Sequence, residues 1–507
     1  MLAPDYLDHA PDRLILLWRQ AEDDILRDVA RRIGKMDALT PTANWQLWRY
    51  QQTEAVRKDV VKLLARYTGK SEAEIRRLMQ EAATAALEAE DEIYYHYGKE
   101  PTPFAENETL QALLNAGYRQ TAGSFSNLTA TTANTVSGAF EQALDRAWLQ
   151  VSSGAFDYKT AVKRAVDGLA DSMPYVTYPS GHRDTLEVAC RRAVLTGANQ
   201  TGAKLQEARM DEMGASFVEV TAHGGARPSH AVWQGRRYHR GGAVDYLGQH
   251  YEDFESATGY GTGAGLCGWN CRHTFFVVFP ELGSPPAWTQ ESLEALNARN
   301  IEYDSKLYTR YEISQMQRAR ERAVRKWKRR YLAEDAAGAD TTASAVKLRQ
   351  ARQSLADFTR ATGGRVDSAR TSVHGFGRSE GSKASYAARK QERFNAANTE
   401  LQQMREAGTI KAKGRLIESP SAPNEINFAS DHVLQRWAER GMGPMDAERI
   451  IRSSKVAMSQ RNGTQTCYYS ELGFVAIGQD GNVSSIGPLD EGGKKLMEVV
   501  KKHGIPH

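Results

Sequence analysis

The chain has 507 residues, of which 41% are hydrophobic and 25% are charged. This composition is ordinary for a soluble protein, and the length predicts roughly three or four domains. The 66 basic and 62 acidic residues nearly balance, which argues against a protein that coats nucleic acid along its whole length. Four cysteines are too few for a disulfide scaffold and fit assembly in a reducing cytoplasm.

The first 100 residues read as a helical layer. Apolar residues recur at helical spacing over 11–36, Asn44–Arg66 and Ser71–Tyr97. Ser71 followed by Glu74 has the pattern of a capping box, which predicts that a new helix starts there. We expect neither a signal peptide nor a membrane-spanning segment.

Residues 101–200 remain mostly helical in pattern, but a Thr/Ser/Gly-rich stretch (TAGSFSNLTATTANTVSG) predicts a loop or a helix start. Thr185–Met213 reads as another long helix. The character then changes, because Ser216–Thr221 alternates like a strand and Thr274–Phe279 resembles a buried strand. These two strands and the loops between them predict a compact α+β unit.

A strongly charged helix is predicted over residues 306–332. Between Arg318 and Arg330 it holds eight basic residues and one acidic residue. Residues 335–400 are rich in Ala, Ser, Gly and Arg, and we expect a flexible linker within Gly363–Ser385.

The last unit begins near Gly414, and Asp480-Gly481 suits a hairpin turn within it. Its predicted elements are two helices, three strands and a closing helix, over Ser430–Arg440, Pro444–Ser453, Thr464–Tyr469, Phe474–Gln479, Val483–Gly487 and from Asp490 onward. The fold class is therefore mainly α with α+β, and its small sheets are antiparallel.

The string CGWNCRH places two thiols and an imidazole within seven residues. Cys and His ligands at short spacing suit a tetrahedral zinc site, and a histidine from an earlier loop would complete it. The candidate ligands are His230, Cys267, Cys271 and His273, with His223 nearby. The alternative is that both cysteines are packed core thiols in a loop held by hydrogen bonds. A catalytic Cys–His pair is a weaker interpretation, because no base, orienting group and oxyanion site occur together.

Three ordered blocks resemble the phage minor capsid protein type 2 family, which is related to the MuF-type head morphogenesis proteins. The blocks are ARPSHAVWQGRRY, CGWNCRHTFFVVFPELG and YTRYEISQMQRARERAVRKWKRR. The resemblance implies a virion protein, incorporated in several copies during assembly, located in the head interior or at the portal vertex, and ejected with the genome. The matching signature positions, which by this resemblance build the fold, are Arg227, His230, Trp233, Gly235, Cys267, Asn270, Cys271, Arg272 and His273.

The charged helix is also a candidate DNA contact. Its basic residues form a stripe at helical spacing, with Trp327 beside them, and such a stripe can follow phosphates. The candidate nucleic-acid-binding residues are Arg318, Arg322, Arg325, Lys326 and Arg329. The alternative is a solvated helix face or a protein–protein contact.

The last unit carries a candidate for metal-independent RNA cleavage. His432, Arg436 and Arg440 are spaced four residues apart on one predicted helix, so they face the same side. A histidine there would act as general acid or base and an arginine would stabilise phosphorane charge. Thr466 and Tyr468, on a strand that follows, complete the candidate catalytic set, with Gln465 and Ser485 nearby.

HxxxRxxxRGM followed by a short helix and antiparallel strands is similar to the barnase/RelE-like nucleases. Such domains are fused to MuF-type proteins in polymorphic toxins, which implies a virion-borne RNase acting on host RNA. The alternative is a non-catalytic binding module.

Together these features predict four parts. They are a helical region for portal or capsid association (1–150), a MuF-like α+β domain (151–300), a basic helix with a flexible linker (301–410) and a barnase/RelE-like domain (411–507). The expected function is that of a structural head protein of a tailed phage. The expected partners are the portal protein, the major capsid or scaffold protein and packaged double-stranded DNA. No cofactor is required by this function, although zinc fits one motif. A zinc-dependent nucleic-acid-binding protein is the remaining alternative.

Overall fold

The computed structural model describes residues 3–36, 42–172, 175–178, 181–418, 426–428, 435 and 437–506. It divides the chain into two compact units, Met1–Ser379 and Glu380–His507. The fold class predicted from the sequence is confirmed, because long helices dominate and the described sheets are small and antiparallel. Among the described helices, none has an apolar stretch long enough to cross a membrane.

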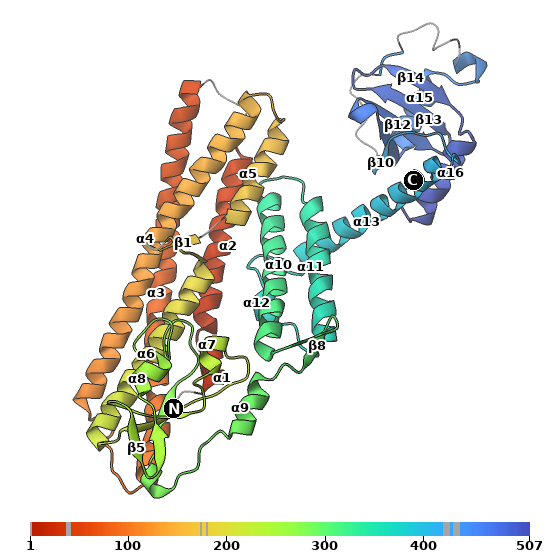
Figure 1. Ribbon diagram of the computed structural model, residues 1–507. Coiled ribbons are helices and arrows are strands. Elements are labelled where there is room, and N and C mark those ends of the chain that lie inside the picture. The colour runs from red at the N-terminus through yellow and green to blue at the C-terminus, as the bar shows by residue number, and fades with distance from the viewer. Residues whose placement is uncertain are drawn as a thin grey trace. The chain divides into compact units, whose positions relative to one another are not determined.

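The first unit is built from long helices, and Figure 1 shows α2, α3, α4 and α6 running beside one another. Its long helices are α2 (Asp12–Gly34), α3 (Thr42–His96), α4 (Glu108–Ser152), α5 (Tyr158–Ser172), α6 (Leu186–Met213), α10 (Arg310–Ala336) and α11 (Thr342–Ala361). Its short helices are α1 (Pro4–His9), α7 (Pro228–Ala231), α8 (Phe254–Thr258), α9 (Gln290–Asn297) and α12 (Ser368–Thr371), with a 3₁₀ turn at Pro280–Leu282.

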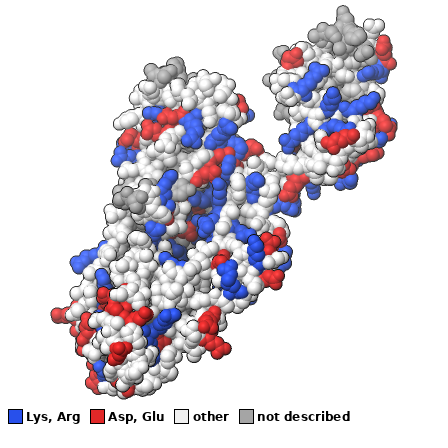
Figure 2. All heavy atoms as spheres, in the orientation of Figure 1, with Lys and Arg blue, Asp and Glu red and all other residues white. Residues whose placement is uncertain are grey.

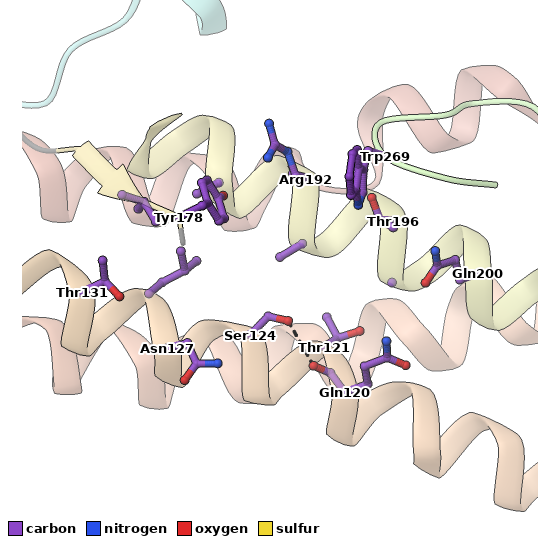
Figure 3. A pocket seen from close by; sticks show the side chains of 15 residues that line it. Gln120, Thr121, Ser124, Asn127, Thr131, Tyr178, Arg192, Thr196, Gln200 and Trp269 are labelled. Carbon is purple, nitrogen blue, oxygen red and sulfur yellow. Dashed lines mark hydrogen bonds between the residues drawn. The ribbon is translucent and has the colours of Figure 1, made fainter. Parts of the chain in front are cut away.

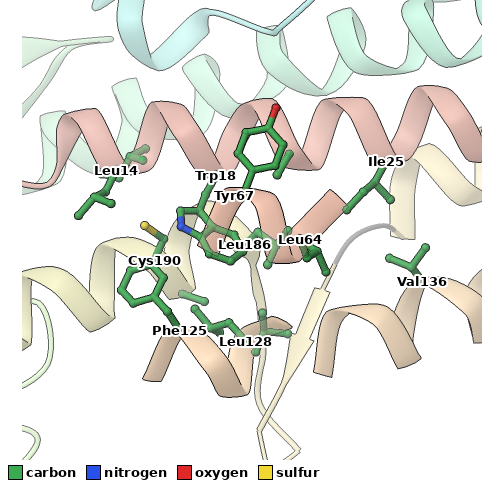
Figure 4. Packing of buried hydrophobic residues seen from close by; sticks show 14 of the residues in the cluster. Leu14, Trp18, Ile25, Leu64, Tyr67, Phe125, Leu128, Val136, Leu186 and Cys190 are labelled. Carbon is green, nitrogen blue, oxygen red and sulfur yellow. The ribbon is translucent and has the colours of Figure 1, made fainter. Parts of the chain in front are cut away.

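The largest core lies between α2, α3, α4, α5 and α6. Trp18 is fully buried at its centre, where its ring packs against Phe125 and its Nε1 donates to Ser71 Oγ at 2.9 Å. An indole N–H in an apolar core needs such a partner. Figure 4 shows the side chains that converge from four helices, among them Leu14, Ile25, Leu64, Tyr67, Leu128, Val136, Leu186 and Cys190.

Two predicted interruptions of the helical body are wrong. The predicted break before Ser71 is absent, because α3 continues from Thr42 to His96 and Ser71 lies inside it, donating to the Tyr67 carbonyl. The predicted loop in the Thr/Ser/Gly-rich stretch is also absent, because α4 runs through it. Hydroxyls such as that of Ser137 donate to carbonyls one turn back, which satisfies them within the helix.

Small residues at the start of that stretch and just before it let α4 and α6 pack closely. A Cβ atom on Gly197 of α6 would lie 2.2 Å from Thr121 Oγ1, and one on Gly117 would lie 2.1 Å from Thr201 Oγ1. Tertiary packing therefore outweighs the weak local helix propensity of these residues.

The α+β unit follows α6 and packs on the ends of α3 and α6 through Tyr94, Ala203 and Met210. Its main sheet has the order β4-β3-β7, and all neighbours are antiparallel. The strands of the first unit are β1 (Tyr175–Thr177), β2 (Arg183–Thr185), β3 (Phe217–Val220), β4 (Arg237–His239), β5 (Val244–Tyr246), β6 (Gln249–Tyr251), β7 (Phe275–Val277), β8 (Ile301–Tyr303) and β9 (Lys306–Tyr308). The two strands predicted from the sequence are β3 and β7.

Helices occupy much of residues 335–400, and α12 and the start of α13 (Arg378–Glu406) lie within Gly363–Ser385, where a flexible linker was predicted. The charged helix is α10, which begins at a capping box formed by Thr309 and Glu312. It is followed by α11, by α12 and by α13. Ala-rich composition permits either a flexible chain or a helix, and here α11 is held on α10 by buried apolar side chains such as Leu355 and Phe358.

The second unit is a five-stranded antiparallel sheet in the order β10-β11-β12-β13-β14. Its elements are α13, β10 (Arg415–Glu418), α15 (Pro444–Ser453), β11 (Val456–Gln460), β12 (Gln465–Ser470), β13 (Gly473–Gly478), β14 (Val483–Gly487) and α16 (Glu491–Lys502). One face of the sheet packs on α13 and α16 and the other on α15 and Trp437, so each face has its own apolar core. The sequence predicted α15, α16 and three of the strands but not β10 and β11.

Candidate functional site

Three of the four predicted zinc ligands meet in the α+β unit. The ligand atoms of His230, Cys271 and His273 all lie within 4.8 Å of one another, and the three residues are buried. The two Nδ1 atoms are 3.4 Å apart, and Cys271 Sγ lies 3.7 Å from Nδ1 of His230 and 3.6 Å from Nδ1 of His273. The structure thus brings these three residues together, and zinc binding by them stays a prediction.

The fourth predicted ligand does not belong to this group. Cys267 is buried, but its Sγ contacts the His273 carbonyl oxygen at 3.6 Å and lies outside the cluster. The backbone explains the separation, because Cys267 and Asn270 both have positive φ, 57° and 53°, and the loop turns sharply between the two cysteines. The inclusion of Cys267 among the ligands is therefore corrected.

The loop before Cys271 depends on glycine. A Cβ atom on Gly265 would lie 2.0 Å from the Gly259 carbonyl oxygen, so no larger residue fits where these two backbone segments cross. The crossing brings the Ala264 carbonyl to Nε2 of His230, at 2.9 Å. His230 itself is presented by α7, whose start at Pro228 favours a helical first turn.

Each histidine is oriented by a hydrogen bond on its outer nitrogen. His230 Nε2 meets the Ala264 carbonyl, and His273 Nε2 meets Gln234 Oε1 at 2.9 Å. Both partners are acceptors, so both Nε2 atoms donate and both Nδ1 atoms present a lone pair. Gln234 was not predicted as a site residue, although its spacing of four residues from His230 was a usable signal.

Burial sets the charge of these groups. It lowers the pKa of His230 to about 4 and that of His273 to about 2, so both rings are neutral near pH 7. It also raises the pKa of the thiols of Cys271 and Cys267. A neutral imidazole is the form that binds a metal ion.

A cavity of about 310 Å³ borders the cluster, and all three of its residues contribute to the lining. The opposite wall comes from the first turns of α10, through Tyr311, Ser314, Gln315 and Arg318. The remaining lining residues are His223, Gly225, Arg227, Asn270 and Arg272. The cluster is therefore buried on one side and reached from a polar, arginine-rich cavity on the other.

A second, larger cavity of about 510 Å³ lies between α4 and α6. Figure 3 shows Gln120, Ser124 and Asn127 on α4 and Arg192, Thr196 and Gln200 on the neighbouring α6, with the Trp269 ring beside Thr196. Trp269 follows Cys267 in the same loop, and its carbonyl accepts from Arg227 at 2.8 Å. The lining of this cavity contains none of the predicted site residues.

Several basic residues of α10, among them Arg325, Lys326, Arg329 and Arg330, form ion pairs inside the first unit. Arg329 is 9% exposed and contacts Glu22 and Asp23 of α2 at 3.0 and 3.3 Å. Arg325 pairs with Glu187 of α6. The prediction that these two arginines bind nucleic acid is therefore corrected, because their guanidinium groups already neutralise buried carboxylates.

The other candidates on this helix are more open to solvent. Lys326 is about half exposed while it contacts Asp171 at 3.0 Å, Arg322 is exposed, and Arg318 lines the cavity beside the histidines. Blue and red side chains lie next to one another on the face of the first unit seen in Figure 2. On the described part of that face, acidic side chains interrupt the basic ones.

The structure describes three of the five predicted catalytic residues of the second unit. His432 and Arg436 lie outside the described residues. Arg440 donates to the Ile486 carbonyl at 2.8 Å, and Thr466 is partly buried on β12. Tyr468 is only 2% exposed within the core under α15, so its prediction as a catalytic residue is corrected to a packing role.

Comparison with known proteins identifies the family. No curated protein and no solved structure matches the chain. A family model described as phage minor capsid protein 2 matches residues 2–360, which is most of the chain and nearly all of the first unit. The chain therefore belongs to the phage minor capsid protein 2 family and is a structural protein of the phage head.

Proposed function

We propose that Met1–Ser379 is built into the head at the portal vertex, in several copies, and that Glu380–His507 is a separate module attached to it. The observation that supports this division is the extent of the family match. It ends at residue 360, inside the first unit, and leaves the second unit outside. The second unit has apolar cores on both faces of its own sheet, as an independent domain should.

The proposed partners of the first unit are the portal protein and the major capsid or scaffold protein. Its long helices offer extended surfaces, and packaged double-stranded DNA lies close by in such a location. Among the five predicted residues of α10, any phosphate contact falls to Arg318, Arg322 and the half-exposed Lys326, because the side chains of Arg325 and Arg329 are largely buried in ion pairs. Ejection of the chain with the genome is part of the same proposal.

A phage that encodes the chain without residues 380–507 tests this division. The truncated protein should still enter heads at the copy number of the full chain and should co-purify with portal vertices from disrupted heads. Quantitative mass spectrometry of purified heads measures both. Loss of the truncated but folded protein from heads would contradict the proposal, as would an even distribution over the capsid shell.

RNA cleavage by the second unit is a second candidate function. A small antiparallel sheet with helices packed on it supports the likeness to barnase/RelE-like nucleases. In that interpretation His432 acts as the general acid or base on the ribose 2′-hydroxyl, and Arg436 or Arg440 stabilises the charge that develops on phosphorus.

The test for cleavage should use a protein that keeps α13. Phe394, Ala397 and Leu401 of this helix belong to the core under the sheet, so a fragment that starts at residue 411 would lack part of that core. The full chain, incubated with structured RNA and no divalent metal, should cleave it, and the His432→Ala variant should not. His503→Ala is a matched control in the same unit, since His503 pairs with Glu400. No cleavage by the full chain would leave a binding module, and equal cleavage by all three proteins would exclude His432 as the general acid or base.

A further inference from the structure

We propose that His230, Cys271 and His273 bind one zinc ion, and that its fourth coordination position opens into the adjoining cavity of about 310 Å³. This site differs from a closed four-ligand site, because Cys267 takes no part in it. It is also independent of where in the head the protein is located.

The distances between the ligand atoms suit one tetrahedral ion. With Zn–N bonds of about 2.0–2.1 Å and a Zn–S bond of about 2.3 Å, tetrahedral geometry requires about 3.3–3.4 Å between two nitrogens and about 3.5–3.6 Å between nitrogen and sulfur. The observed separations are 3.4 Å between the nitrogens and 3.6 and 3.7 Å from nitrogen to sulfur. One ion at the common centre of these atoms would contact all three at normal bond lengths.

The surrounding hydrogen bonds prepare the same arrangement. Both Nε2 atoms donate to fixed acceptors, the Ala264 carbonyl and Gln234 Oε1, which leaves both Nδ1 lone pairs directed into the cluster. Metal-bound histidines in proteins are commonly held in this way by a carbonyl or carboxylate on the outer nitrogen. A shared ion explains why the imidazoles of His230 and His273 and the thiol of Cys271 are buried against one another.

The donor atoms select the kind of metal. Two nitrogens and one sulfur suit zinc, whereas magnesium and calcium require oxygen ligands. Cysteine binds as the thiolate, so a zinc ion displaces the proton of Cys271 to solvent and the loaded site keeps one positive charge. Copper accepts a similar donor set, and elemental analysis separates the two metals.

The fourth position faces the cavity because all three ligands line it. Arg227, Arg272 and Arg318 line the same cavity, so its lining is rich in positive charge. His223 also lines it, with its ring 4.4 Å from that of His273 between centroids, yet it is not one of the three clustered residues. A water molecule or an anionic oxygen donor such as phosphate therefore suits the open position.

Metal analysis of the full chain provides the first test. The protein, purified without chelator and with zinc in the growth medium, should contain about one zinc per chain. Cys271→Ser should lose it, whereas Cys267→Ser should keep it, although both thiols are buried and only four residues apart. His223→Ala should also keep it. Absence of zinc from the wild-type protein, bound copper in its place, or equal loss in Cys267→Ser would overturn the proposal.

Cobalt substitution provides a second test that does not depend on a variant folding. The wild-type protein loaded with Co²⁺ should show the visible spectrum of a tetrahedral site and the charge-transfer absorption of a single thiolate. Inorganic phosphate, added as a probe, should shift the visible bands because it reaches the open position. A spectrum with two thiolates would reject the assignment of the ligands, and a spectrum that phosphate leaves unchanged would reject the open position.

Discussion

Gln234 Oε1 lies 2.9 Å from Nε2 of His273 and 3.1 Å from the backbone nitrogen of His223. Since a backbone N–H can only donate, the amide oxygen faces both groups, and His273 must donate from Nε2. One amide therefore determines which nitrogen of His273 faces Cys271 and His230.

Replacing Gln234 tests that relationship. Gln234→Ala should lower the zinc affinity of the chain by about 10–100-fold, because the His273 ring loses the acceptor that orients it. The change should leave the ligand set intact, so the cobalt-loaded variant should keep the single-thiolate spectrum. Competition with a chromophoric chelator measures the affinity. An affinity equal to that of the wild type would mean that the hydrogen bond does not position the ring.

Glu90 should make stability depend on pH. It lies in α3, where its carboxylate accepts from Gln206 Nε2 at 2.9 Å and from the Val277 backbone at 3.2 Å. Burial raises its pKa from 4.5 to about 7. The folded chain therefore holds this proton more tightly than the unfolded chain, and the stability this provides is complete below pH 4.5 and is lost as the pH rises through 7.

Glu90→Gln removes this titration. As the pH rises from 5 to 8, the wild type should lose on the order of 2–3 kcal/mol of its free energy of unfolding through this group. The variant should not show this loss, so its free energy of unfolding should rise by that amount relative to the wild type. Denaturant unfolding at several pH values measures the difference. Glu92→Gln, at an exposed position on the same helix, should show no such gain. Parallel pH profiles for Glu90→Gln and the wild type would refute the assignment.

Arg329 should matter for folding rather than for DNA binding. It neutralises Glu22 and Asp23, which are buried with it. Arg329→Met leaves these carboxylates unpaired and should cost about 3–5 kcal/mol of stability. Burial raises the pKa of both carboxyl groups, so the loss should be larger at pH 8 than at pH 5, where they take up protons more readily.

Arg322 is the matched position on the same helix. It is exposed, so Arg322→Met should change stability by less than about 0.5 kcal/mol. If α10 contacts packaged DNA, this variant should weaken binding to double-stranded DNA and reduce the salt dependence of log K by about one. Fluorescence anisotropy over a range of salt concentrations measures both. Unchanged binding in Arg322→Met would assign this face to a protein contact or to solvent.

Ser71 tests the core between α2 and α3. Ser71→Ala leaves the buried Trp18 N–H without its acceptor, which should cost about 1–3 kcal/mol. Ser124→Ala is a suitable control, because Ser124 also lies inside a long helix and donates to the carbonyl one turn back, Gln120, at 3.2 Å. The control should be close to neutral in thermal or denaturant unfolding. Equal effects of the two changes would show that the indole is satisfied in another way.

The sequence by itself determined the elements whose signals are local. Helical periodicity predicted α2, and the predicted starts at Thr185 and Asp490 coincide with the N-caps of α6 and α16. Pro444–Ser453 was predicted with its observed bounds. The spacing within CGWNCRH and the histidine of the preceding block were enough to expect a Cys–His cluster. Periodicity and short spacings act over a few residues, so they can be read without the fold.

Only the tertiary structure decided which groups meet across long separations. The sharp turn at Cys267 and Asn270 excluded one thiol and joined the other to His230, 41 residues away. Packing against α6 kept α4 helical through its Ser/Thr-rich stretch. Carboxylates of α2 and α6 pair with Arg329 and Arg325, so these basic residues of α10 form contacts within the fold. The physical reason is the same in each case, because burial and ion pairing depend on the neighbours that the folded chain supplies.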